Sequence, residues 1–135
     1  MSPSLPAPFL DFIALFNRGA FWESHEVLEA PWRKNRSGFY KGLILYASAY
    51  VHVQRGNARG VISQLQKAER HLVAYRPVYL GLDVDALLAH AIQCRGMLAE
   101  RPGAAPGRRE SRIPLIHLEP EPTRLRGDEM ELRAP

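Results

Sequence analysis

The sequence predicts an all-α fold, a single five-helix bundle with an extended, proline-rich C-terminal tail. Apolar residues recur at helical spacing in five segments before residue 100, and turn residues separate these segments. None of the segments alternates apolar and polar residues as a strand does. A chain of 135 residues, 46% of them hydrophobic, is long enough for one core. We therefore divide it into a helical bundle domain, residues 1–100, and a tail, residues 101–135.

The first two helices are predicted at residues 7–17 and 20–34. The apolar face of the first consists of Phe9, Phe12, Ile13 and Phe16, and Gly19 follows as a left-handed stop. The second helix contains Pro31, which lacks an amide and clashes with the preceding turn at a cost of about 3 kcal/mol in a regular helix. We expect this helix to bend or restart near Pro31.

The third helix, predicted at residues 39–55, is apolar on almost every side, as is typical of the central helix of a bundle. Its polar exceptions are Lys41, Ser48, His52 and Arg55, which fall within about 60° of one another at 100° per residue. We interpret this stripe as a face turned toward solvent.

The fourth and fifth helices are predicted at residues 58–75 and 83–100, with Asn57 and Asp83 as their N-caps. Their predicted core positions are Val61, Leu65, Ala68, Leu72 and Tyr75 in the fourth and Leu87, Ala91, Cys94 and Leu98 in the fifth. The tail beyond them holds six of the eleven prolines and few apolar residues. We expect its one cohesive piece, residues 113–120, to dock on the bundle and the rest to be loose.

Composition narrows the class of protein. The net charge of +4 is spread along the chain, which is weak evidence for nucleic-acid binding. The single cysteine, Cys94, can form neither an internal disulfide nor a cysteine-based zinc site. The longest mostly apolar run, residues 42–53, is far shorter than a membrane span. We expect a soluble cytoplasmic protein without a membrane partner, and the apolar third helix is compatible with a homodimer.

Ionisable residues occur on the expected inner face of the second helix. Trp22, His25, Glu29 and Trp32 fall within about 80° of arc on a helical wheel. A buried carboxylate is costly unless it has a partner, and His25, four residues earlier, is near enough to pair with Glu29. The pattern predicts a buried His/Glu pair between the second and third helices, with the two tryptophans as walls of a pocket.

These residues carry a resemblance to a known family. His25, Glu29 and Trp32 spell the motif HxxxExxW, and the chain resembles the small helical proteins called domain of unknown function 309. The stretch FNRGAFWESHEVLEAPWR resembles the first signature of that family, and FYKGLILYASAYVHVQRGNARGVISQLQKAERHL resembles the second. Together they extend over about residues 9–98. The resemblance implies an all-helical fold and brings no established activity.

The pair admits a structural interpretation, which we favour, and two chemical ones. As a structural element, it is a satisfied polar pair that fixes which helices pack together. As a metal site, His25, Glu29 and His52 hold a divalent transition metal with hydrolase-type chemistry, although Glu29 replaces the second histidine of the HExxH pattern. As a metal-free enzyme, the pair is an acid–base couple beside Lys41 or Ser48.

A further interpretation is an interaction module. The bundle surface, with Arg55, Arg59, Lys67 and Arg70, together with the tail, then binds a protein or a nucleic acid, nucleic acid being the less expected partner. Neither a catalytic residue nor a substrate follows from the sequence.

Overall fold

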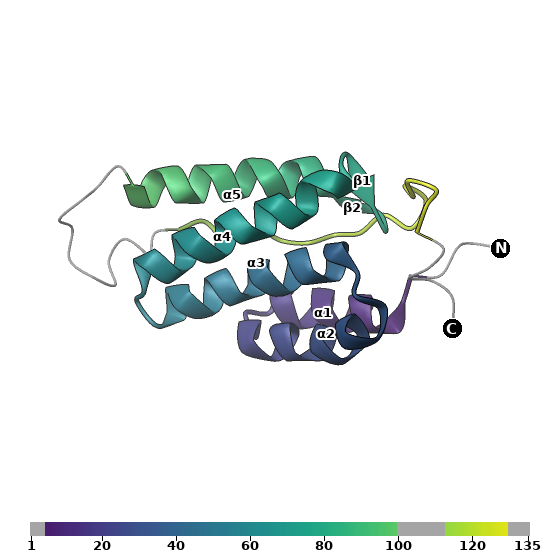
Figure 1. Cartoon of the computed structure of the whole chain (residues 1–135), viewed down its shortest axis with the longest axis horizontal. Coiled ribbons are helices and arrows are strands. Elements are labelled where there is room, and N and C mark those ends of the chain that lie inside the picture. Colours follow the sequence, from purple (N-terminus) through teal and green to yellow (C-terminus); the bar gives the residue numbers. More distant parts are fainter. Residues whose placement is uncertain (1–4, 100–112, 130–135) are drawn as a thin grey trace.

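The computed structural model describes residues 5–99 and 113–129, and within them the predicted all-α fold is confirmed (Figure 1). The five helices are α1 (Ala7–Asn17), α2 (Phe21–Asn35), α3 (Gly38–Gln54), α4 (Ala58–Leu72) and α5 (Val84–Ala99). A short 3₁₀ helix, η1 (Val73–Tyr75), continues α4. The segment between η1 and α5 forms an antiparallel hairpin of β1 (Val78–Tyr79) and β2 (Leu82–Asp83).

The hairpin corrects the expectation that residues 1–100 contain no strand. Each of its strands has two residues, too few for an alternating pattern to show in the sequence. Leu80 and Gly81 form its turn with positive φ angles of 48° and 76°. A Cβ atom on Gly81 would overlap the backbone oxygen of Glu121 in the tail, so glycine is required where the two segments meet.

The predicted stop at Gly19 and the predicted N-caps Asn57 and Asp83 are confirmed, whereas α4 ends at Leu72 and a 3₁₀ turn covers the rest of the predicted helix. Gly19 has a φ of 82° after α1. The side chain of Asn57 accepts a hydrogen bond from the amide of Gly60 at 3.1 Å, and Asp83 accepts one from Ala86 at 2.9 Å. Of the bend or restart expected at Pro31, the restart does not occur, because α2 continues through this residue to Asn35.

Helix α3 is the centre of the bundle, with α1 and α2 on one side and α4 and α5 on the other (Figure 1). The side chains of its polar stripe are half-buried or exposed, as predicted, while most of the others are buried. A Cβ atom on Gly42 would lie 2.6 Å from Leu72, so this glycine allows α3 and α4 to approach closely. All the predicted core positions in α1, α4 and α5 are buried, and Tyr75, in η1, is half-buried.

The tail contributes to the core. Residues 113–129 run lengthwise between α3 and α5 to the hairpin (Figure 1), and Ile113 and Leu118 are buried. Within residues 121–129, which we expected to be loose, most side chains are exposed but Glu129 is only 2% exposed. The rest of the tail, residues 101–112 and 130–135, lies outside the described residues. Among the helices that are described, none is long and apolar enough to cross a membrane.

Candidate functional site

The buried face of α2 differs from the predicted one. Phe21, Ser24 and Leu28 point into the bundle, and the Ser24 hydroxyl bonds to the carbonyl of Phe21 at 2.8 Å. Trp22, expected as a pocket wall, is 48% exposed. The helix is therefore rotated relative to the wheel, so that one small self-satisfied hydroxyl is buried in place of two ionisable groups.

His25 and Glu29 lie at the edge of this buried face. The distance between Nε2 of His25 and Oε1 of Glu29 is 3.4 Å, and the side chains are 18% and 25% exposed. The carboxylate also faces Arg33 at 3.5 Å. The pair is thus half-buried rather than buried. Nδ1 of His25 is inaccessible and has no hydrogen-bond partner among the described residues.

The two tryptophans of the motif segment both lie against cationic or titratable side chains. The indole of Trp22 stacks on the ring of His25 with 5.3 Å between centroids and 13° between planes, and the guanidinium of Arg55 lies 5.8 Å from the indole centroid. Trp32 has Arg36 at 4.6 Å and Lys41 at 4.5 Å from its ring centroid. The site therefore combines aromatic rings with cations.

Among the described residues, two further predicted site residues, His52 and Ser48, form no hydrogen bond or ion pair with His25 or Glu29. His52 faces the start of α4, where its Nδ1 is 3.1 Å from the side-chain amide of Asn57. Burial, and then the charge of Arg55, lowers the pKa of His52. Ser48 is half-buried and bonds to none of the other predicted site residues. Residues 5–99 and 113–129 contain no group of three or more His, Cys, Asp or Glu side chains placed to hold a metal ion.

A polar cluster that the sequence analysis did not single out lies between α3, α5 and the tail. His90 is its centre: Nδ1 is 2.5 Å from the Tyr46 hydroxyl, and Nε2 is 2.8 Å from the carbonyl oxygen of Pro114. The Tyr50 hydroxyl donates to the same carbonyl at 2.7 Å. Because that oxygen can only accept, His90 carries its proton on Nε2 and accepts from Tyr46 at Nδ1. Burial lowers the pKa of His90, and the bond to Pro114 partly opposes this shift.

Cys94 lies beside His90 as a buried thiol. Its sulfur lies 3.6 Å from Nε2 of His90, and burial raises the pKa of the thiol to about 11 although a bond with Tyr50 opposes the rise. A thiol with that pKa stays protonated near neutral pH, and the thiolate is the reactive form. The sequence pattern that could have revealed this cluster consists of two pairs at i, i+4 spacing, Tyr46 with Tyr50 and His90 with Cys94.

The fold and this site define a small all-α bundle protein with a half-buried His/Glu pair beside two tryptophans. Residues 9–64 match the model of a family described as Domain of unknown function (DUF309), so over this segment the chain is similar to that family. The match is shorter than the expected resemblance to about residue 98 and includes all the predicted site residues. No curated protein and no solved structure matches the chain.

Proposed function

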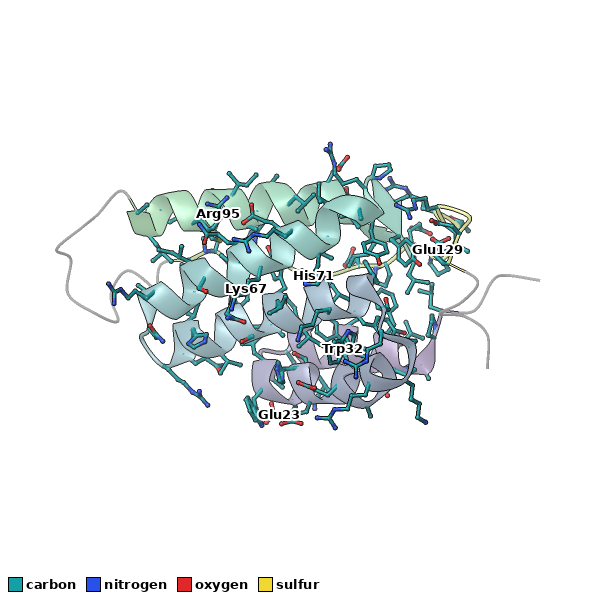
Figure 2. All side chains as sticks on the ribbon, in the orientation of Figure 1. Glu23, Trp32, Lys67, His71, Arg95 and Glu129 are labelled. Atoms are coloured by element: carbon teal, nitrogen blue, oxygen red, sulfur yellow. The ribbon has the colours of Figure 1, made fainter. Side chains whose placement is uncertain are left out.

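We propose that this protein is a binding module, and that the face carrying Trp32 takes an acidic segment of a partner protein. The observation that supports this is the placement of Arg36 and Lys41 against one indole ring, 4.6 and 4.5 Å from its centroid. Neither cation forms an ion pair among the described residues. His71 of α4 lies close enough to Lys41 for the lysine charge to add to the lowering of its pKa, which burial mainly causes. Figure 2 places Trp32 and His71 on the same face.

An anion would stabilise this arrangement. The two cationic groups lie no more than about 9 Å apart, because both are within 4.6 Å of the same centroid. At that separation they repel each other by about 0.5 kcal/mol in bulk water and by more in a less polar environment. A carboxylate that contacts these cations offsets the repulsion and gains charge-assisted hydrogen bonds, to which the arginine can contribute two.

A protein partner fits the surrounding charges better than a nucleic acid. Helix α2 exposes Glu23 and Glu26 near its start and the cations Arg33 and Lys34 near its end, so an extended phosphate backbone along the helix would meet carboxylates as well as cations. A short acidic side chain can contact Arg36 or Lys41 without approaching Glu23 or Glu26. The site thus favours a local carboxylate over an extended polyanion.

The His25–Glu29 pair is not part of the proposed binding face, and we assign it a positioning role for Trp22. Partly exposed pairs at i, i+4 spacing contribute only about 0.3–0.5 kcal/mol to stability. The pair instead holds the His25 ring in the plane on which Trp22 stacks. We expect Glu29→Gln to lower the free energy of unfolding by less than about 1 kcal/mol. Urea denaturation measures this, and a loss of several kcal/mol would contradict a positioning role.

Binding is tested on the Trp22→Phe variant, in which Trp32 is the remaining tryptophan of the sequence. A short glutamate-rich peptide should change the fluorescence of Trp32, and the change should disappear near 1 M salt, where the Debye length is about 3 Å. Lys41→Ala should weaken binding about fivefold, which corresponds to roughly 1 kcal/mol. The matched control is Lys67→Ala, because Lys67 is an exposed lysine on α4 without a contact to Trp32.

Two results would contradict this proposal. If Lys67→Ala weakens binding as much as Lys41→Ala, the peptide responds to net charge and not to the Trp32 face. If a single-stranded oligonucleotide displaces the peptide and binds more tightly, with the same dependence on Lys41, the partner is a nucleic acid. Circular dichroism of each variant checks that the helices are intact.

A divalent transition metal at His25 and Glu29 is the second candidate. The observation that favours it is the 3.4 Å separation of Nε2 of His25 from Oε1 of Glu29, which is close enough for both atoms to bind one ion. Two side chains are half of a tetrahedral ligand set, so further ligands would have to come from beyond the described residues. Elemental analysis of protein purified without a chelating resin tests this candidate. One equivalent of bound metal that is lost in Glu29→Gln supports the metal site. The absence of stoichiometric metal contradicts it.

A further inference from the structure

The backbone of the tail is held by two polar clamps from the helices. The carbonyl of Pro114 accepts from Tyr50 of α3 at 2.7 Å and from His90 of α5 at 2.8 Å. Four residues later, the side chain of Asn17 at the end of α1 donates to the carbonyl of Leu118 and accepts from its amide, both at 2.8 Å. An amide side chain that pairs with both backbone groups of one residue replaces a neighbouring strand.

Side chains of the tail alternate between the groove and solvent. Ile113 and Leu118 are buried and Ile116 is half-buried, while Leu115 and His117 are exposed. A hollow of about 130 Å³ remains beside Ile116 and Leu118, next to Leu87 at the start of α5. Helices α1, α3 and α5 thus form a groove that holds an extended peptide by its backbone and by two aliphatic anchors.

A third attachment fixes the end of the tail at the hairpin. The buried carboxylate of Glu129 accepts from the amide of Leu80 at 2.9 Å and from the amides of Arg126 and Gly127 at 2.7 and 2.6 Å. The guanidinium of Arg126 donates to the carbonyl of Ala74 at 2.7 Å. Glu129 lies at the hairpin end of the molecule in Figure 2, beyond the end of the groove.

We propose that the groove between α1, α3 and α5 is a peptide-recognition site, and that it accepts the tail of a second copy of the chain in place of its own. Every contact described above joins residues 113–129 to the bundle or to each other. The same contacts therefore form when the tail comes from another chain.

The connection is long enough for such an exchange. Residues 100–112 join Ala99 to Ile113, and a fully extended segment of that length spans up to about 45 Å at 3.3–3.6 Å per residue. That reach exceeds the length of any helix in the bundle. The attached tail has the advantage of a high effective concentration, so exchange between chains increases with protein concentration.

The peptide site is tested with full-length protein. Leu118→Asp places a charge in the groove and weakens docking of the chain's own tail. A fluorescein-labelled peptide of residues 113–129 with the natural sequence should then bind this variant at least about tenfold more tightly than it binds the unaltered protein, whose groove is filled. Adding Asn17→Ala to the variant removes two bonds to the peptide and should weaken binding about tenfold.

The control peptide carries the same Leu118→Asp change and should not bind. Equal affinity of the natural peptide for the variant and the unaltered protein, or binding to neither, overturns the site. If Leu118→Asp does not fold, Leu118→Ala replaces it, and a rise of its melting temperature on addition of the peptide is then the expected result. No rise would again contradict the proposal.

The exchange of tails between two copies of the chain is tested by a separate measurement. Unaltered protein, partly unfolded and refolded at high concentration, should contain dimers by light scattering, and Leu118→Asp should remain monomeric. Dimers that persist in Leu118→Asp show another interface, and monomers at all concentrations of the unaltered protein show that the groove takes its own tail alone; either result overturns exchange. Neither of these results bears on the acidic-peptide experiment, because the Trp32 face is separate from the groove.

Discussion

Replacing Glu129 by alanine should lower the free energy of unfolding by about 3 kcal/mol. The carboxylate accepts three backbone amide bonds, and one donor, Leu80, is itself fully buried. Each buried donor that loses its acceptor costs about 1–3 kcal/mol, and bonds to a charged acceptor are at the upper end. Urea denaturation followed by circular dichroism measures the change.

The matched variant is Glu129→Gln, which keeps one acceptor oxygen and loses the charge. We expect about half of the effect of alanine. If Glu129→Ala and Glu129→Gln both change the unfolding free energy by less than about 0.5 kcal/mol, residues 121–129 do not stabilise the bundle in solution. The peptide of residues 113–129 should then bind no better than one that ends at residue 120.

Glu129 should also make the free energy of unfolding decrease at acidic pH. Burial alone would raise the pKa of this carboxyl, but the amides of Arg126, Gly127 and Leu80 more than offset it and hold the pKa below the ordinary 4.5. As the pH falls below 4.5, the unfolded chain takes up the proton first, so this part of the stability is present above that pH and is lost below it. Glu129→Gln should lack this part of the pH dependence.

The sequence was sufficient for the helices because their signals are local. The Phe9, Phe12, Ile13 and Phe16 face and the caps at Asn57 and Asp83 depend on residues within a few positions of one another. Glu129 had no such signal: its partner Leu80 is 49 positions away, in a turn that is itself hard to predict. A carboxylate in a proline-rich tail normally indicates a solvated residue.

The orientation of α2 was predicted less well than its existence. The wheel placed Trp22 inward because tryptophan is large and apolar, yet its indole stacks on His25 at the surface and Ser24 takes the buried position. Burying an ionisable pair costs more than burying a hydroxyl that bonds within its own helix. The i, i+4 relation between His25 and Glu29 survived this rotation because it depends only on helical spacing.

His90 connects the two parts of the molecule that the sequence analysis treated separately, the bundle and the tail. Its ring lies nearly parallel to those of Tyr46 and Tyr50, with centroid distances of 6.0 and 6.3 Å. Its Nε2 proton holds Pro114, and its Nδ1 accepts from Tyr46, whose hydroxyl also lies 3.2 Å from the carbonyl of Leu87. The tail is thus attached to a titratable group whose pKa is lowered by burial.

His90→Ala should lower the free energy of unfolding by about 2–3 kcal/mol. The ring leaves a cavity against two tyrosines, and the Tyr46 hydroxyl keeps only its longer contact with Leu87. For a chain of this size each kcal/mol corresponds to roughly 3–6 °C in melting temperature. His90→Gln retains an amide donor for the carbonyl of Pro114 and should lose about half as much.

The pH dependence separates the contribution of His90 from that of Glu129. Burial lowers the pKa of His90 below the ordinary 6.5, so as the pH falls below 6.5 the unfolded chain takes up a proton before the folded one does. Stability is therefore full above that pH and decreases as the pH falls toward the folded pKa. Between pH 7 and 5 the melting temperature of the natural protein should fall more than that of His90→Gln, while Glu129→Gln follows the natural protein in this range. Parallel curves for the natural protein and His90→Gln would mean that the ring has no lowered pKa and that the clamp on Pro114 does not depend on its protonation.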